Sequence, residues 1–189
     1  MAHVQAAPGA DAAHEPKSFL RRYIFSTDHK VIGIQYFLTA MAVAVVAGGM
    51  ALFIRLHLAW PLAQWPLLEK LFPAGMKGGT MDPEFYLALV TMHGTLMVFF
   101  VISFALVSGF GNYLIPLQIG ARDMAFPFLN MLSYWVVVPA TLIMFASFFV
   151  EGGAAAAGWT AYPPLSAVPQ AIAGSGMGQT LWLLGMALF

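Results

Sequence analysis

Long stretches without charged side chains alternate with short polar segments along this sequence. Residues 31–54 contain neither a charged residue nor a histidine, and residues 85–121 contain no Asp, Glu, Lys or Arg. A helix rises 1.5 Å per residue, so about 20 apolar residues cross the hydrocarbon core of a bilayer. The pattern predicts membrane-spanning helices at about 31–54, 85–115 and 127–150.

A fourth apolar run occupies residues 179–189, where the given sequence ends. The run is too short to cross about 30 Å of hydrocarbon, so we expect a span that continues in a longer protein. The fold class predicted is an all-α membrane protein. It is a transmembrane helix bundle with three complete spans and the start of a fourth, over residues 31–189.

The polar segments at the start of the chain divide into two parts. Residues 1–17 are rich in Ala, Pro and His, which predicts a disordered tail. No apolar core lies within the first twenty residues, so a cleaved signal peptide is not expected. Residues 18–30 are predicted to lie at the membrane interface, with Asp28 among the residues suited to cap the first span. Pro127 suits the first turn of the third.

Composition supports a membrane protein and excludes several other classes. Hydrophobic residues make up 60% and charged residues 8%, whereas soluble domains carry roughly 25% charged residues. The formal net charge is zero, so we expect the lipid bilayer and no nucleic acid as a partner. Cysteine is absent, which removes disulfides, iron–sulfur clusters and thiolate chemistry. Any metal must therefore be held by His, Met or oxygen ligands.

Basic residues are distributed unequally between the two sides of the predicted bundle. Cytoplasmic loops of membrane proteins carry an excess of Lys and Arg. The side of the N-terminus has five basic residues and the opposite side three, which favours a cytoplasmic N-terminus. The five are Lys17, Arg21, Arg22, Lys30 and Arg122, and the three are Arg55, Lys70 and Lys77.

One imidazole, His93, lies inside the second predicted span, roughly 12 Å along the helix from Phe85. An ionisable group at this depth is costly unless it has a partner. Three interpretations stay open from the residues alone: a histidine bonded to a neighbouring helix, a haem ligand, or a proton relay. Gly94 and Thr95 keep the local bulk low, as a flat macrocycle requires.

Arg55 ends the first span in the same leaflet as His93. A cation there can extend to the interface, the interpretation that the residues alone favour, or it can donate hydrogen bonds to a cofactor. The Gly48-Gly49 pair in the same span would allow close packing of another helix.

Polar side chains gather at the opposite membrane face. Asn130 and Ser133 are three residues apart and share a helix face, and Asn112 and Asp123 lie nearby in sequence. A carboxylate, two amides and a hydroxyl at one face are typical of the mouth of a hydrated proton path. Asp123 could equally pair with Arg122 or cap the following helix, so both interpretations stay open.

Five ordered motifs together resemble subunit I of the haem–copper oxidases, and residues 26–33 resemble the entry to that family's first helix. The resemblance covers Phe19 to Phe189. The motifs are Thr91-Met-His-Gly-Thr-Leu-Met97, Phe110-Gly-Asn-Tyr-Leu-Ile-Pro116, Gln118-Ile-Gly-Ala-Arg-Asp-Met-Ala-Phe-Pro127, Leu132-Ser-Tyr-Trp135 and Gly158-Trp-Thr-Ala-Tyr-Pro-Pro-Leu-Ser166.

The resemblance implies roles for individual residues of a fragment from the N-terminal third of a twelve-helix subunit. His93 matches an axial ligand of the low-spin haem, and Arg55 matches the arginine that hydrogen-bonds the formyl group of haem a. Asp123 matches the entrance of a proton channel. Asn112, Asn130 and Ser133 lie along that channel; the family often has a second Asn after Asn130, where this chain has Met131.

The implied activity belongs to a proton-pumping terminal oxidase that reduces O2 to water with electrons from cytochrome c. Implied partners are oxidase subunits II and III, the remainder of subunit I, and cytochrome c. A haem of the a3 type and copper B are expected in the complete subunit, with ligands beyond Phe189. The implied location is the bacterial inner membrane.

Three other functions remain as alternatives. A quinol oxidase of the same superfamily is the nearest, because residues 118–123 suit that branch whereas residues 110–113 suit the cytochrome c branch. A haem-free proton-coupled transporter would use His93 and Asp123 as a relay. A purely structural membrane subunit would need neither residue.

Overall fold

The computed structural model describes residues 18–189 except 169 and 173, so the tail predicted over residues 1–17 lies outside the described residues. Among these described residues, three helices are long and apolar enough to cross a membrane. They are α1 (His29–Ala59), the continuous stretch α3 (Pro83–Thr95), η2 (Leu96–Phe110) and α4 (Gly111–Gln118), and α5 (Pro127–Ala146) extended by η3 (Ser147–Phe149).

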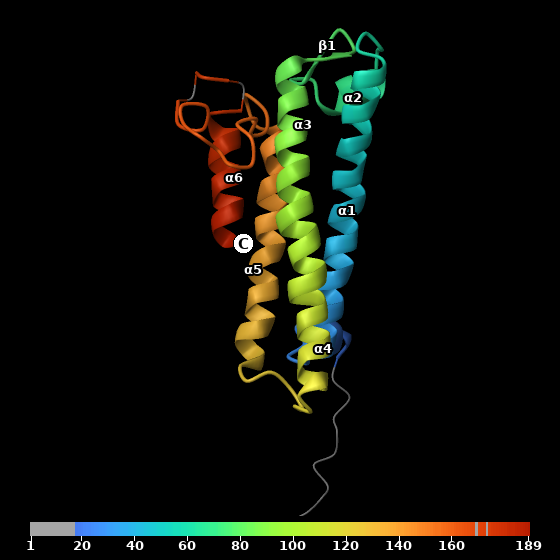
Figure 1. Cartoon of the computed structure of the whole chain (residues 1–189), viewed down its shortest axis with the longest axis vertical. Helices are drawn as coiled ribbons and strands as arrows, with labels where there is room; N and C mark the ends of the chain where they lie inside the picture. Colours follow the sequence, from blue (N-terminus) through green and yellow to red (C-terminus); the bar gives the residue numbers. More distant parts are fainter. Residues whose placement is uncertain (1–17, 169, 173) are drawn as a thin grey trace, which may run out of the picture.

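These helices run side by side, and the shorter α6 (Met177–Leu188) packs along α5 (Figure 1). The prediction of an all-α membrane fold with three long apolar helices is confirmed. One end of the bundle carries the segment between α1 and α3 together with residues 150–168, 170–172 and 174–176. The other end carries the turn between α4 and α5 (Figure 1).

The long helices begin where the sequence supplies capping residues. The Asp28 carboxylate accepts a hydrogen bond from the Lys30 backbone N–H at 2.8 Å, as predicted for the start of α1. At the start of α3, the Asp82 carboxylate accepts a hydrogen bond from the Glu84 backbone N–H at 3.1 Å. Pro127 opens α5, where its missing N–H costs no helical bond.

Two glycines bring α1 and η2 into close contact. A Cβ built on Gly33 would lie 2.9 Å from the Gly109 carbonyl oxygen, so any larger residue would push the backbones apart. No helix of the described residues packs closely at Gly48-Gly49, because a Cβ on either residue meets no atom within 4 Å. Glycine alone does not reveal which face of a helix meets a neighbour, and here the close contact is at the other end of α1.

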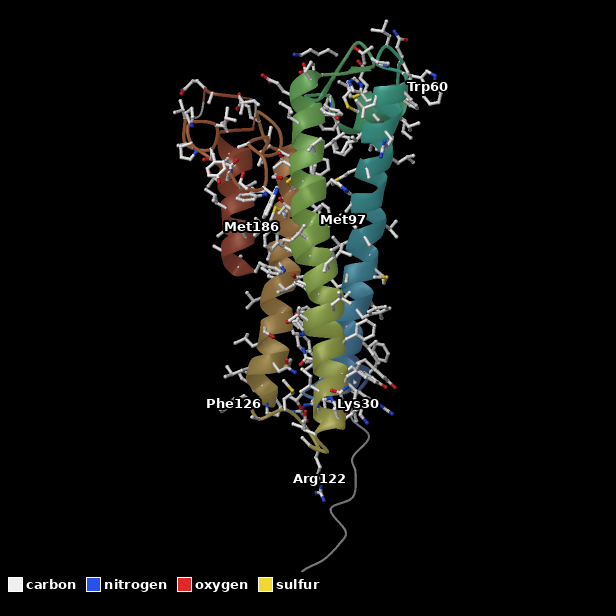
Figure 2. The ribbon with its side chains drawn as sticks, in the orientation of Figure 1. Lys30, Trp60, Met97, Arg122, Phe126 and Met186 are labelled. Atoms are coloured by element: carbon white, nitrogen blue, oxygen red, sulfur yellow. The ribbon has the colours of Figure 1, made fainter. Side chains whose placement is uncertain are left out.

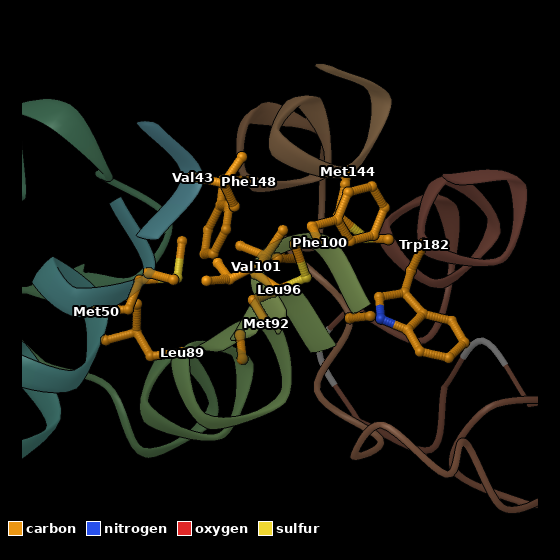
Figure 3. Packing of buried hydrophobic residues seen from close by; sticks show 14 of the residues in the cluster. Val43, Met50, Leu89, Met92, Leu96, Phe100, Val101, Met144, Phe148 and Trp182 are labelled. Atoms are coloured by element: carbon orange, nitrogen blue, oxygen red, sulfur yellow. The ribbon is translucent and has the colours of Figure 1, made fainter. Parts of the chain in front are cut away.

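Large apolar side chains fill the space between the helices. Met92, Leu96 and Phe100 are fully buried along α3 and η2, and they pack with Met144 of α5 and Trp182 of α6 (Figure 3). The Trp182 indole N–H donates to the Thr95 hydroxyl at 3.1 Å. This polar bond inside an apolar interface fixes the rotation of α6 against α3.

The segment between α1 and α3, predicted as a loop, contains a short helix and a hairpin. The helix α2 (Pro66–Leu71) is followed by strands β1 (Met76–Lys77) and β2 (Thr80–Met81), in which Met76 pairs with Met81. Gly78 and Gly79 have φ values of +63° and +81°, the left-handed region that a two-residue hairpin turn requires. An ion pair between Lys77 and Asp82 joins the hairpin to the start of α3.

The middle of the second long helix, η2, is hydrogen-bonded in the wider π pattern. In that pattern an N–H reaches the carbonyl five residues earlier. The Ser103 hydroxyl follows the same spacing and donates to the Val98 carbonyl oxygen at 3.2 Å. The π-helical segment η2 lies between His93 in α3 and Asn112 in α4. It therefore sets the direction in which Asn112 points about the helix axis relative to His93.

The predicted interfacial segment forms a short turn, η1 (Leu20–Ile24), that is held from two helices. The Gln35 side chain of α1 donates to the Tyr23 and Ile24 carbonyl oxygens at 2.6 and 2.9 Å. The Trp135 indole of α5 also donates to Ile24, at 3.1 Å. These bonds anchor the segment at the end of the bundle that also carries the turn between α4 and α5.

Candidate functional site

His93 is bonded to the neighbouring helix through one of its two ring nitrogens. Its Nδ1 lies 2.9 Å from the backbone carbonyl oxygen of Ala47 on α1. A carbonyl only accepts, so Nδ1 carries the proton and Nε2 of the neutral ring keeps its lone pair. Histidines that ligate metals usually donate their other ring N–H in this way. The ring is therefore oriented and retains a nitrogen able to bind iron.

The space beside this imidazole suits a flat ligand. Gly94 follows His93, and Gly48 follows Ala47, and a Cβ on either glycine would meet no atom within 4 Å. A planar group can therefore approach the α1 and α3 backbones closely at this level. Within residues 18–189 as described, no group of three or more His, Asp or Glu side chains could hold a metal ion. A porphyrin would need a single axial nitrogen here, and Nε2 of His93 can offer one.

Arg55 lies on the same face of α1 as Gly48. The two residues are seven apart, about two helical turns, and Arg55 stands roughly 12 Å along α1 from Ala47. Its side chain is exposed. From this position the guanidinium can extend to the membrane interface, or donate to an acceptor on a planar group that lies against Gly48. The geometry is compatible with both interpretations of Arg55.

At the opposite end of the bundle, polar side chains from three helices line a cavity of about 530 Å³. Tyr36 of α1, Asn112 of α4 and Ser133 of α5 all reach it. The Ser133 hydroxyl donates to the Asn130 carbonyl oxygen at 2.7 Å, so the Tyr36 hydroxyl, 2.9 Å from Ser133 Oγ, is the donor to it. The structure thus brings Asn112 and Ser133 to one cavity from two consecutive helices, with Tyr36 reaching it from α1.

Two side-chain amide atoms near this cavity have no hydrogen-bond partner in the described part of the chain. They are Asn112 Oδ1 and Asn130 Nδ2, both inaccessible to solvent. The Asn112 amide N–H donates to the Ser108 carbonyl oxygen at 2.7 Å, so only its oxygen is unsatisfied. Buried polar atoms usually find a partner, often an ordered water. The cavity is roomy enough to hold several such waters.

Asp123 lies in the exposed turn between α4 and α5, at the end of the bundle that holds Arg122 and Phe126 (Figure 2). Its carboxylate accepts from the Met124 N–H at 2.8 Å. No side chain caps the start of α5, so Asp123 is not its helix cap. No ion pair joins Asp123 to Arg122 in the described residues. The carboxylate is therefore accessible to water, at the same end as the cavity but outside its lining.

Two residues of this region were not identified from the sequence. Tyr36 lines the cavity. The sequence feature that could have identified it is a tyrosine inside a charge-free span, because a buried tyrosine hydroxyl needs a hydrogen-bond partner. His29 is 2% exposed, and its Nδ1 lies 2.9 Å from the Asn112 carbonyl oxygen. His29 thereby joins the start of α1 to α4 and positions Asn112.

Comparison with known proteins matches most of the chain to one protein family. The model of the family described as "Cytochrome C and Quinol oxidase polypeptide I" matches residues 31–189. The chain is 44% identical over 179 residues to the alternative cytochrome c oxidase subunit 1 of Bradyrhizobium diazoefficiens, covering 93% of this chain and 27% of that protein.

Two further relatives also match most of this chain. The chain is 43% identical over 166 residues to cytochrome c oxidase subunit 1 of Thermostichus vulcanus, covering 88% of this chain and 26% of the relative. It is 41% identical over 173 residues to the heme-copper oxidase subunit I+III of Aeropyrum pernix, covering 91% and 19% respectively. The chain thus spans about a quarter, or less, of the length of these three proteins.

Proposed function

The chain belongs to the family of cytochrome c and quinol oxidase polypeptide I, the subunit I family of the haem–copper oxidases, and from this membership we propose that it is the N-terminal portion of the catalytic subunit of a terminal respiratory oxidase. Its three long apolar helices make it an integral membrane protein. The family implies haem and copper cofactors and a complex with other oxidase subunits. The reaction proposed for the whole enzyme is the reduction of O2 to water coupled to proton pumping.

In this proposal His93 is an axial ligand of the low-spin haem. The bond from its Nδ1 to Ala47 supports the role, because it leaves Nε2 free and oriented. The open space beside Gly48 and Gly94 supports the approach of a porphyrin. The haem would supply reversible one-electron transfer. His93 would hold the haem, and its bond to Ala47 would orient the ring that does so.

Arg55 is proposed to donate a hydrogen bond to the formyl group of haem a. Its place on the Gly48 face, two turns along α1, supports this assignment. A cation with a hydrogen bond at the edge of the haem disfavours the oxidised state, because that state carries the extra positive charge. Arg55 would therefore raise the reduction potential.

Asp123, Asn112, Asn130 and Ser133 are proposed to form a proton-uptake path. Asp123 collects protons at the surface, since its carboxylate is exposed. The unsatisfied amide atoms of Asn112 and Asn130 would bind water in and beside the cavity. The hydroxyls of Tyr36 and Ser133, already joined at 2.9 Å, extend the hydrogen-bonded chain along the cavity wall.

The proposed electron donor is cytochrome c, acting through a copper centre on another subunit. The names of two relatives, cytochrome c oxidase subunit 1 in each case, support this choice over quinol. Proposed partners are subunits II and III and the rest of subunit I, which would bring the a3-type haem and copper B. The bacterial inner membrane is proposed as the location, with the N-terminus cytoplasmic because basic residues are more numerous on that side.

One observation carries the proposal: an imidazole inside an apolar span, held through Nδ1 and open at Nε2. The test is replacement of His93 by Ala in the full-length subunit within its purified complex. We expect the low-spin haem to be lost or to become high-spin, with a changed visible spectrum. His57→Ala is the matched control, since His57 only lies against Tyr86 at the end of α1.

The alternatives predict other outcomes of that experiment. A transporter without haem would show no Soret band in the unmodified protein. A structural subunit would keep its haem spectrum and its electron transfer after His93→Ala. Either result would contradict the proposed role of His93.

A further inference from the structure

The helical turn that carries His93 is held on the face opposite its imidazole. Successive residues of an α-helix differ by about 100° in direction, so Thr91 and Thr95, two residues before and after His93, each leave the helix about 160° away from it. Both threonines are buried, at 3% and 0% exposed. This face of α3 is therefore covered within the described residues themselves.

Two segments that are distant in sequence bond to this face. The Trp182 indole N–H of α6 donates to Thr95 Oγ1 at 3.1 Å, with its nitrogen turned toward the helix formed by α3 and η2 (Figure 3). The Gly158 backbone N–H, in the segment between η3 and α6, donates to Thr91 Oγ1 at 3.0 Å. On the other side of α3, the His93 imidazole bonds to the α1 backbone. The turn is thus held from both sides.

The two threonines are also joined to each other across His93. The Thr95 hydroxyl donates to the Thr91 carbonyl oxygen at 2.8 Å while it accepts from Trp182. The α pattern ends directly after this turn, where the Leu96 N–H is shared between the carbonyl oxygens three and four residues earlier and the π pattern of η2 begins. A regular helix therefore does not fix the rotation of this turn from the η2 side, and the side-chain bonds help to set it.

We propose that Thr91 and Thr95 are positioning residues for the low-spin haem: through Gly158 and Trp182 they set the rotation of α3 at His93. The inference rests on the proposed function, in which His93 is an axial ligand. The bond that Nδ1 donates to the α1 backbone raises the basicity of the nitrogen that binds the metal. A rotation of α3 that lengthens this bond lowers that basicity, which disfavours the oxidised haem and raises its reduction potential.

Apolar packing alone would specify this rotation less well. Met92 and Leu96 are fully buried beside the threonines and keep water away from them. Hydrophobic contact is non-directional, whereas a hydrogen bond requires a narrow range of distance and angle. In these low-dielectric surroundings the bonds are also stronger, and an unpaired donor is costly. The threonine bonds therefore select one orientation among those that the apolar contacts allow.

The experiment replaces Thr95 in the full-length subunit of the purified complex and follows the low-spin haem by redox titration and electron paramagnetic resonance. Thr95→Val keeps the shape of the side chain and removes both bonds of its hydroxyl. We expect the reduction equilibrium to shift toward the reduced haem by about ten-fold, as for loss of an outer-shell partner, or about 59 mV for one electron. The g values of the oxidised haem, which report the orientation of its axial ligands, should change as well.

Three variants separate the hydroxyl from the shape of the side chain. Thr95→Ser keeps the hydroxyl, so its potential and g values should match those of the wild type. Trp182→Phe removes the donor of the same bond and should shift the potential in the same direction, and combining it with Thr95→Val should add nothing to the shift of Thr95→Val. Thr141→Val is the matched control: Thr141 is buried, but its hydroxyl donates within α5, so both measurements should stay unchanged.

Hydrogen exchange tests the other bond without using the haem. In Thr91→Val the Gly158 amide loses its acceptor, so it should exchange faster than in the wild type, and Thr91→Ser should restore its protection. Thr91→Val should also raise the potential of the low-spin haem. Unchanged exchange together with an unchanged potential in Thr91→Val would remove Thr91 from the positioning set.

The inference is wrong if His93→Ala loses the low-spin haem while Thr95→Val keeps the potential and g values of the wild type. It is also wrong if Thr95→Ser shifts them as far as Thr95→Val, since the shape of the side chain would then be responsible. Retention of the low-spin haem in His93→Ala would contradict the proposed function, and this inference with it. If Thr95→Val does not assemble, Trp182→Phe must show the shift toward the reduced haem.

Discussion

His93 donates a hydrogen bond of 2.9 Å from Nδ1 to the carbonyl oxygen of Ala47, joining α3 to α1 inside the membrane-spanning region. A backbone carbonyl does not titrate, and it accepts whatever side chain residue 47 carries. The bond therefore fixes the tautomer of the neutral imidazole whatever the side chain at position 47. The ring is held by the protein and still has a nitrogen to offer a ligand.

Asp123→Asn should slow turnover of the complete oxidase while leaving its haem spectrum unchanged. The substitution keeps the size of the side chain and its bond from the Met124 N–H, and it removes the carboxylate proposed to take up protons. General acid–base groups typically contribute 10²–10⁴-fold, and water can substitute in part at an exposed site, so we expect a decrease of roughly ten-fold or more. Steady-state oxygen consumption, with visible spectra of the same samples, measures both effects.

Arg122→Gln serves as the control for a general change of surface charge, because Arg122 is exposed in the same turn and forms no ion pair with Asp123 in the described residues. Its turnover should stay close to that of the unmodified enzyme. A normal rate in Asp123→Asn would count against the proton-uptake assignment. An altered haem spectrum would show that the turn supports the fold as well as proton uptake.

Thr95→Val should destabilise the packing of α6 on α3. The Thr95 hydroxyl accepts from the buried Trp182 indole, and valine has the same shape but no acceptor. An indole N–H left unsatisfied in the interior costs about 1–3 kcal/mol. Thermal unfolding of the detergent-solubilised complex, followed by tryptophan fluorescence, measures the loss.

Thr141→Val is the matched control within α5. Thr141 is also buried, but its hydroxyl only donates to the Val137 carbonyl oxygen one turn earlier. That carbonyl keeps its helical N–H partner, so the cost should be smaller than for Thr95→Val. Equal losses in the two variants would mean that the bond to Trp182 contributes little.

The main features of the fold could be predicted from the sequence because burial in lipid leaves few solutions. Charge-free stretches of sufficient length have to be helices, since every backbone N–H and C=O must be satisfied internally. Asp28 and Pro127 act at helix starts, as predicted. The wide hydrogen bonding of η2 and the Gly33–Gly109 contact were not predicted, because both depend on how neighbouring helices meet.

The candidate site was predicted less completely. Asn112 and Ser133, proposed from their position at one membrane face, do line one cavity. The partner of His93 was not found in the sequence because it is a backbone carbonyl, which every residue carries. Tyr36 was missed because a tyrosine in an apolar span looks like ordinary packing until its hydroxyl partner is known.

Gly33→Ala should destabilise the protein by forcing α1 away from η2. The added methyl would lie 2.9 Å from the Gly109 carbonyl oxygen and 3.1 Å from the Tyr113 backbone nitrogen, and neither backbone atom can move independently. Overpacking of this kind typically costs about 1–3 kcal/mol. Gly49→Ala is the control, with no atom within 4 Å of its methyl, and its melting temperature should not fall. Equal melting temperatures for the two variants would refute the close contact.

The ion pair between Lys77 and Asp82 should make the hairpin insensitive to pH across the neutral range and weaker at both extremes. The hydrogen bond from Lys77 lowers the pKa of Asp82, so the stabilisation from this carboxylate is complete above its unfolded value of about 3.9 and is lost as the pH falls through the lower folded value. The same bond to Asp82 raises the pKa of Lys77. The stabilisation from that ammonium is complete below about 10.4 and is lost as the pH rises through the higher folded value.

Hydrogen exchange of the Trp65 amide, which donates to the Gly79 carbonyl oxygen at 2.8 Å, measures opening of this hairpin. After correction for the intrinsic pH dependence of exchange, protection should be constant from about pH 5 to pH 9 and should fall in strong acid as Asp82 is protonated. Asp82→Asn keeps a cap on α3 but removes the charge. At neutral pH the Trp65 amide of this variant should therefore be as weakly protected as the Trp65 amide of the wild type in strong acid. Asp82→Ala loses the cap as well and should cost about 1 kcal/mol more. Protection that stays unchanged in Asp82→Asn would show that the hairpin is held by Gly78, Gly79 and the strand pairing alone.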